Sequence, residues 1–120
     1  MDLNSKNVMV VELPGPLDVI RGYSKKEIRA MKESARQGDP VSMMVLAGGY
    51  YMGDGVPADK RECVKWCRKA AQQGVADAQY NLGSCCYNGD GVSQDDWKAV
   101  KWWRRASMQG HAKAQESLVA

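Results

Sequence analysis

The sequence predicts an all-α fold, an α/α solenoid of helix-turn-helix repeats with about six helices and an extended N-terminal arm. A repeated loop is the first indication: YMGDGVPAD at 51–59 returns thirty-six residues later as YNGDGVSQD at 87–95. The duplication is longer than the loop, because residues 38–73 match residues 74–109 at fourteen of thirty-six positions without a gap, where composition alone would give roughly two. A repeating unit of this length that holds two helices is typical of a solenoid.

The segment before the duplicated part is predicted to form a helix over 25–37. Ser24 and Glu27 have the spacing of a capping box, in which each side chain accepts a hydrogen bond from the backbone of the other residue. The segment aligns with the second helix of each repeat at a shift of thirty-six residues. It is therefore expected to be a half repeat.

Two helices are predicted in each repeat, at 40–52 and 59–73 and then at 75–88 and 95–109. Asp59 and Asp95 suit the N-cap of each second helix, apolar residues follow at helical spacing, and Gly74 or Gly110 closes the helix. The Gly-Asp-Gly loop between the two helices lacks the Lys-Ser/Thr of a phosphate loop and the alternating acids of a calcium loop. Its glycines are instead expected to end one helix in the left-handed conformation and to turn the chain into the next.

A last helix is predicted over 111–119, where the sequence aligns with the first helices. Glu116 stands where the second repeat has Tyr80, and Val119 stands where it has Gly83. Because the end of a solenoid needs a polar outer face, this segment is expected to be a capping helix.

The expected domain layout is an N-terminal extended arm at 1–23 and one repeat domain at 24–120. Within that domain we expect a half repeat, two full repeats and the capping helix, at 24–37, 38–73, 74–109 and 110–120. A chain of 120 residues with 44% hydrophobic and 26% charged residues is ordinary for one soluble domain. The N-terminus lacks the basic start and apolar run of a signal peptide, so a cytoplasmic location with reduced cysteines is expected.

The repeats also resemble a known family, the Sel-1-like repeat (SLR), a relative of the tetratricopeptide repeat. The resemblance covers about residues 24–120 and is carried by four motifs: RKAAQQG at 68–74, ADAQYNLG at 76–83, CYNGDGVSQD at 86–95 and KAVKWW at 98–103. It implies an adaptor or scaffold that binds other proteins. Nothing in it implies a cofactor.

Comparison of equivalent positions points to a partner-binding stripe on the first helix of repeat one. The second repeat has a polar stripe there, expected to face away from the core and made of Asp77, Asn81, Ser84 and Asn88. The first repeat has apolar residues and a glycine at those positions, and Met44 adds adaptable surface beside them. We call this set the repeat-one stripe: Val41, Met44, Val45, Gly48 and Met52. An aligned apolar stripe of this kind requires a cover.

Three covers are open at this point. The apolar segment at 8–13 could fold back over the stripe in cis. A partner protein could lay a peptide or a helix along it. Alternatively, arms could exchange or pair between two copies of the chain. The favoured hypothesis is a non-catalytic protein-binding module with one dedicated partner, which it would serve as an adaptor, inhibitor or chaperone-like binder.

The second helices carry the competing surface, a basic ridge that could bind nucleic acid or an acidic partner. Its members occupy three repeated positions: Arg29, Lys32, Lys65, Arg68, Lys69, Lys101, Arg104 and Arg105. Acidic neighbours dilute this charge, and Trp66 and Trp102 fall on core positions of the repeat. Nucleic-acid binding is therefore the alternative rather than the favoured function.

The sequence predicts no enzyme, no metal site and no cofactor. Cys63 and Cys86 occupy core positions, so the cysteines are expected to be small buried hydrophobes. His111 is the single histidine and is expected to be a solvated side chain at a helix entrance. No nucleophile can be assigned beside it.

Overall fold

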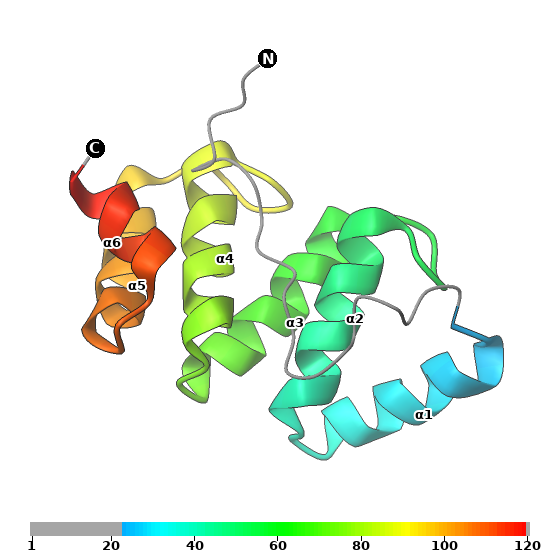
Figure 1. Ribbon diagram of the computed structural model, residues 1–120. Coiled ribbons are helices and arrows are strands. Elements are labelled where there is room, and N and C mark those ends of the chain that lie inside the picture. Colours follow the sequence, from blue (N-terminus) through cyan, green and yellow to red (C-terminus); the bar gives the residue numbers. More distant parts are fainter. Residues whose placement is uncertain (1–22, 120) are drawn as a thin grey trace.

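The computed structural model describes residues 23–119, and these residues form six α-helices and no strand. Figure 1 shows the helices stacked in chain order, from α1 at one end to α5 and α6 at the other. Their bounds are α1 Lys25–Arg36, α2 Pro40–Met52, α3 Lys60–Gln72, α4 Ala76–Asn88, α5 Asp96–Met108 and α6 Ala112–Val119. The predicted all-α fold and its six helices are confirmed, with each end within one residue of the expected position. The apolar segment at 8–13 lies outside the described residues.

Local hydrogen bonds explain where the helices begin. Ser24 and Glu27 form the predicted capping box, and Asp59 and Asp95 cap α3 and α5 as expected. Asp39 caps α2 by accepting from the backbone N–H of Ser42. These caps satisfy N–H groups that have no partner within the helix.

The Gly-Asp-Gly loops end the first helices as predicted. Gly53 and Gly89 both have φ 75°, a left-handed conformation in which glycine is favoured, and each donates its N–H back into the helix. The second loop also approaches the preceding repeat closely. A Cβ placed on Gly91 would lie 2.3 Å from the backbone oxygen of Lys60, so this position accepts only glycine without rearrangement. The Lys60 ammonium also pairs with the Asp90 carboxylate at 3.2 Å.

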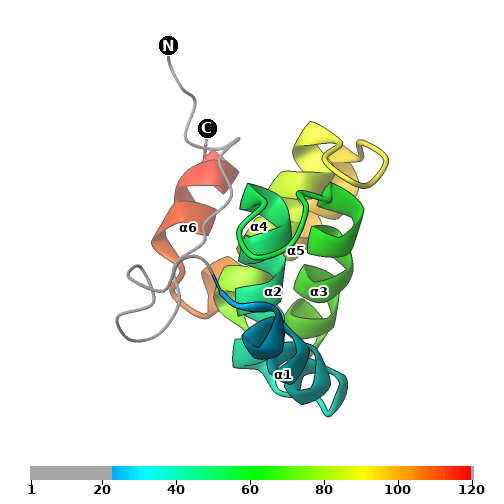
Figure 2. The same ribbon diagram turned by 90° about the vertical axis from the view of Figure 1, so that its right-hand side faces the viewer.

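The core is continuous along the stack, since each helix packs on the helices before and after it. Figure 2 looks along the stack from the α1 end. The largest fully buried side chains of this core include Leu46, Leu82 and Tyr80. Two glutamines at one repeated position tie neighbouring repeats together. The Gln73 amide donates to the Gly38 oxygen at 3.0 Å, and the Gln109 amide donates to the Gly74 oxygen at 2.9 Å.

Candidate functional site

The repeat-one stripe lies on α2, and its residues differ widely in exposure. Val41 and Met52, at the two ends of the helix, are 44% and 58% exposed. Val45 is half-buried between them. Met44 is 4% exposed and Gly48 is buried, so both belong to the packed interior. The exposed part of the stripe is thus two apolar side chains, with one half-buried valine between them on the helix.

The prediction that the polar stripe on α4 faces the solvent is wrong at two positions. Asn81 is fully buried and Ser84 is 2% exposed. The physical reason is the place of α4 in the stack, where it lies between α2 and α6 and packs on α3 and α5 (Figure 1). The Ser84 hydroxyl has no hydrogen-bond partner, so its burial lowers the stability of the fold.

His111 is not a solvated side chain, contrary to the sequence-based expectation. Its side chain is 10% exposed, and its Nε2 lies 2.8 Å from the Asp77 carboxylate. The ring stacks on Tyr80 with centroids 4.9 Å apart, and its Nδ1 accepts from the backbone N–H of Ala114 at 3.2 Å. One ring nitrogen therefore ties α6 to α4 and the other caps α6, so both are engaged in structural contacts.

The residues of the basic ridge lie on α1, α3 and α5. Seven of its eight side chains are exposed, and Lys32 is half-buried. The tryptophans beneath it are covered by these cations. The Lys65 ammonium lies 4.9 Å from the centre of the Trp66 ring, and the Arg105 guanidinium lies 4.7 Å from the centre of the Trp102 ring. These cations occupy the ring faces on which a nucleic-acid base would have to stack.

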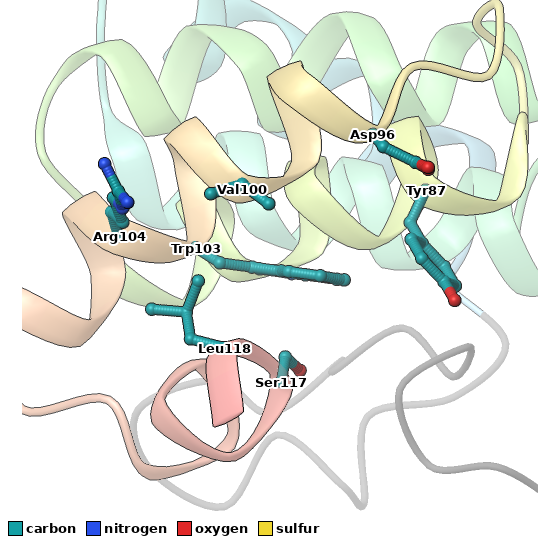
Figure 3. A pocket seen from close by; sticks show the side chains of 7 residues that line it. All are labelled: Tyr87, Asp96, Val100, Trp103, Arg104, Ser117 and Leu118. Carbon is teal, nitrogen blue, oxygen red and sulfur yellow. The ribbon is translucent and has the colours of Figure 1, made fainter. Parts of the chain in front are cut away.

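A pocket of about 400 Å³ opens at the α5 and α6 end of the stack. Figure 3 shows the Trp103 ring between the two helices, with Tyr87 at one end and Leu118 beside it. Asp96 and Arg104 lie at its rim on α5. The sequence did not predict this pocket. The signal for it was Trp103, a large aromatic residue where the preceding repeat has Cys67.

All four cysteines are buried thiols, as predicted. A hydrogen bond to Cys67, together with desolvation, raises the pKa of Cys63 far above its ordinary value. A hydrogen bond with Cys63, followed by desolvation, does the same to the pKa of Cys85. The protonated form is a poor nucleophile and a poor metal ligand. Among residues 23–119 no group of three or more histidine, cysteine or acidic side chains is arranged to hold a metal ion.

Comparison with known proteins assigns the two repeats. A family model described as Sel1 repeat matches residues 40–75 and 76–111, two residues later than the repeat boundaries chosen from the sequence. Comparison with the curated proteins finds no match. None of the described helices is both long enough and apolar enough to span a bilayer.

Two solved structures resemble the chain closely. One is a protective antigen of uropathogenic Escherichia coli strains that displays an SLR fold, with a TM-score of 0.76 and 35% identity over 78% of this chain. The other is a Sel1 repeat protein from Oxalobacter formigenes, with a TM-score of 0.76 and 34% identity, also over 78% of this chain. The matched region spans only 20% and 27% of those two proteins.

Proposed function

Since the chain belongs to the Sel1 repeat family, whose members generally mediate protein–protein interaction, we propose that it is a non-catalytic module that binds one dedicated protein partner through the repeat-one stripe. The partner would be a protein that this chain recruits, inhibits or chaperones. The four buried thiols fit a reducing compartment such as the cytoplasm, where we place the interaction.

The observation that carries this proposal is the contrast between two equivalent helices. Val41 and Met52 on α2 are exposed apolar side chains where α4 has the polar Asp77 and Asn88. Because each of these side chains is about half exposed, covering the rest of it would contribute about 0.7–1.5 kcal/mol. The half-buried Val45 lies between them on the same helix. A helix or an extended peptide laid along α2 would meet all three.

The test compares a double variant of the stripe, Val41→Glu with Met52→Glu, with the wild type. Both residues are exposed, so the substitutions leave the core intact. Proteins captured by each form from an extract of the source cell are identified by mass spectrometry, and the affinity for the purified candidate is measured by calorimetry. We expect the double variant to bind at least tenfold more weakly, a loss of about 1.4 kcal/mol or more.

The matched control places two glutamates on the basic ridge, as Lys65→Glu with Lys101→Glu. It should keep the wild-type affinity and helical circular dichroism. A deletion of residues 1–20 tests whether the arm competes with the partner for the stripe. If it does, the deletion variant should capture more of the partner than the wild type. If the stripe variant binds the partner as well as the wild type does, the proposal is wrong.

Binding through the basic ridge remains the competing function, because its cations align at repeated positions and seven of the eight are exposed. The same two variants separate the two surfaces. Binding through the ridge would be lost in the Lys65→Glu and Lys101→Glu control and kept in the stripe variant. It would also weaken steeply as salt rises, because phosphate or carboxylate partners bind cations electrostatically.

A further inference from the structure

The α5 and α6 end of the stack has apolar positions that are covered one repeat earlier. Val64 is 3% exposed and Leu82 is fully buried. Their equivalents Val100 and Leu118 are only half-buried and line the pocket beside α5 (Figure 3). The reason is that further helices follow α3 and α4 in the stack and pack on α4, whereas the described residues contain no helix that follows α6.

The outer side of α5 is also more apolar than the matching side of α3. Trp97 is 85% exposed where α3 has Arg61, and Met108 is 86% exposed where α3 has Gln72. Val119 on α6 adds a third large exposed side chain, at 86%. A terminal helix that faces only water is expected to carry polar residues on its outer side. Large exposed apolar side chains instead mark a contact surface.

The charges beside Val100 are arranged symmetrically. Asp96 lies four residues before Val100 and Arg104 lies four residues after it, which places each about 6 Å away along the helix axis. The Asp96 carboxylate accepts from the side chain of Gln94. No acidic side chain among the described residues forms an ion pair with Arg104. The row Asp96, Val100 and Arg104 can therefore pair with an antiparallel copy of itself, with each acidic residue opposite a basic one.

We propose that this end of the molecule is a dimer interface with a second copy of the chain, related by a two-fold axis that passes close to Val100. The two α5 helices would cross antiparallel, with the valines in contact at the axis. Asp96 of each copy would then face Arg104 of the partner subunit, and Trp97 would approach the partner's pocket. Such an isologous contact closes on itself, and it is the commonest symmetry of soluble oligomers.

Head-to-tail stacking through α1 is the other way in which a second copy could cover this surface. It fits poorly, because α1 has Glu27 and Ser34 where α5 has the buried Ala99 and Ala106. Stacking α1 on α6 would also bring the Glu27 carboxylate toward Glu116. Burial of two carboxylates beside each other without a neutralising cation is costly, so the tail-to-tail arrangement is favoured.

The test is a charge swap on the full chain, followed by sedimentation equilibrium over a range of concentrations. The wild type is expected to dimerise reversibly. Asp96→Arg alone and Arg104→Asp alone should each weaken dimerisation at least tenfold, because each places like charges opposite one another. The double variant, with both substitutions, should recover most of the wild-type affinity, since the pair is restored in reverse.

Arg68→Asp is the matched control, because Arg68 is exposed and occupies the position of Arg104 one repeat earlier. It should dimerise like the wild type. The variant of the repeat-one stripe, Val41→Glu with Met52→Glu, should also dimerise like the wild type, so a failure of the dimer can be told apart from a failure of the proposed function. A wild type that stays monomeric at millimolar concentration would overturn the proposal. So would single variants that behave like the control, a double variant that fails to recover, or growth beyond the dimer.

Discussion

At the scale of single residues, the same repeated position performs different tasks in different helices. The position before each first helix is Asp39 in α2, Val75 in α4 and His111 in α6. Asp39 and His111 cap their helices through their side chains, whereas Val75 makes no side-chain cap. Since Val75 offers no capping group, packing of α4 on α3 and α5 stabilises its first turn instead.

Asp39 offers a direct test of a capping contribution. Its carboxylate accepts from the Ser42 hydroxyl at 2.7 Å, from the Ser42 N–H at 3.3 Å and from the Ser34 hydroxyl at 3.2 Å. The bond from the Ser42 hydroxyl is the main cause that lowers the pKa of Asp39 below its ordinary value. We expect Asp39→Ala to lose about 1 kcal/mol of unfolding free energy near neutral pH, measured by urea denaturation.

The pH dependence follows from the lowered pKa. Because the folded form holds its proton less tightly than the unfolded chain, the contribution of Asp39 is complete above about pH 4 and fades as the pH falls below that. The stability difference between wild type and Asp39→Ala should shrink over the same range. Asp39→Asn is the control, since it keeps a capping oxygen without a titrating group. A difference that stays constant down to pH 2 would contradict this account.

At the scale of helix pairs, the two repeats solve the same packing problem with different sizes. In repeat two, Gly83 on α4 lets Trp103 of α5 come close enough to donate its indole N–H to the Tyr80 oxygen at 3.2 Å. Repeat one has Ala47 and Cys67 at the equivalent positions, a larger residue on the first helix and a smaller one on the second. The side-chain volume at this contact is divided differently between the two helices of each repeat. Each first helix is therefore matched to the second helix of its own repeat.

Gly83→Ala should therefore destabilise the protein although alanine favours a helix by about 1 kcal/mol. The new Cβ would lie 2.6 Å from the Trp103 ring and 3.0 Å from the Ala99 backbone oxygen, and overpacking of this kind costs about 1–3 kcal/mol. A double-mutant cycle with Trp103→Leu, followed by thermal and urea unfolding, is the measurement. The smaller side chain should relieve the clash. The double variant should therefore lose less unfolding free energy than the two single variants together, by about 0.5 kcal/mol or more, which is the size of a measurable coupling between residues in contact. Strict additivity would mean that the clash is absorbed elsewhere.

At the scale of the whole molecule, the main helix contacts join only consecutive helices, from α1 with α2 to α5 with α6. Stability in such a stack is approximately a sum over neighbours, so a local defect should stay local. His111 is a suitable probe. It joins α6 to α4 through Asp77 and caps α6 through the Ala114 N–H.

We expect His111→Ala to speed hydrogen exchange in α6 by roughly thirty-fold, because the lost cap and the lost hydrogen bond are together worth about 2 kcal/mol. Amides of α2 and α3 should exchange at the wild-type rate, as read by mass spectrometry of peptides. His111→Asn, which can still cap the helix, should show a smaller effect. Equal acceleration throughout the chain would show that the stack unfolds as one cooperative unit.

The sequence by itself determined the period, the helix positions and the caps. These features depend on residues within one or two turns of each other, as in the Ser24 and Glu27 capping box, or on the thirty-six-residue repeat. The family followed from the same motifs. The apolar character of the repeat-one stripe was also predictable, because it required only the comparison of aligned positions.

Only the tertiary structure decided which of those side chains face the solvent. Met44, Asn81 and Ser84 are buried because helices stack on both sides of the first helices, and a single helix pattern does not contain that information. The pairing of His111 with Asp77 likewise joins residues thirty-four positions apart. The pocket beside Trp103 exists because α5 and α6 meet there without a further described helix to fill it. Local hydrogen bonding is encoded along the chain, whereas exposure depends on the stacking of the repeats.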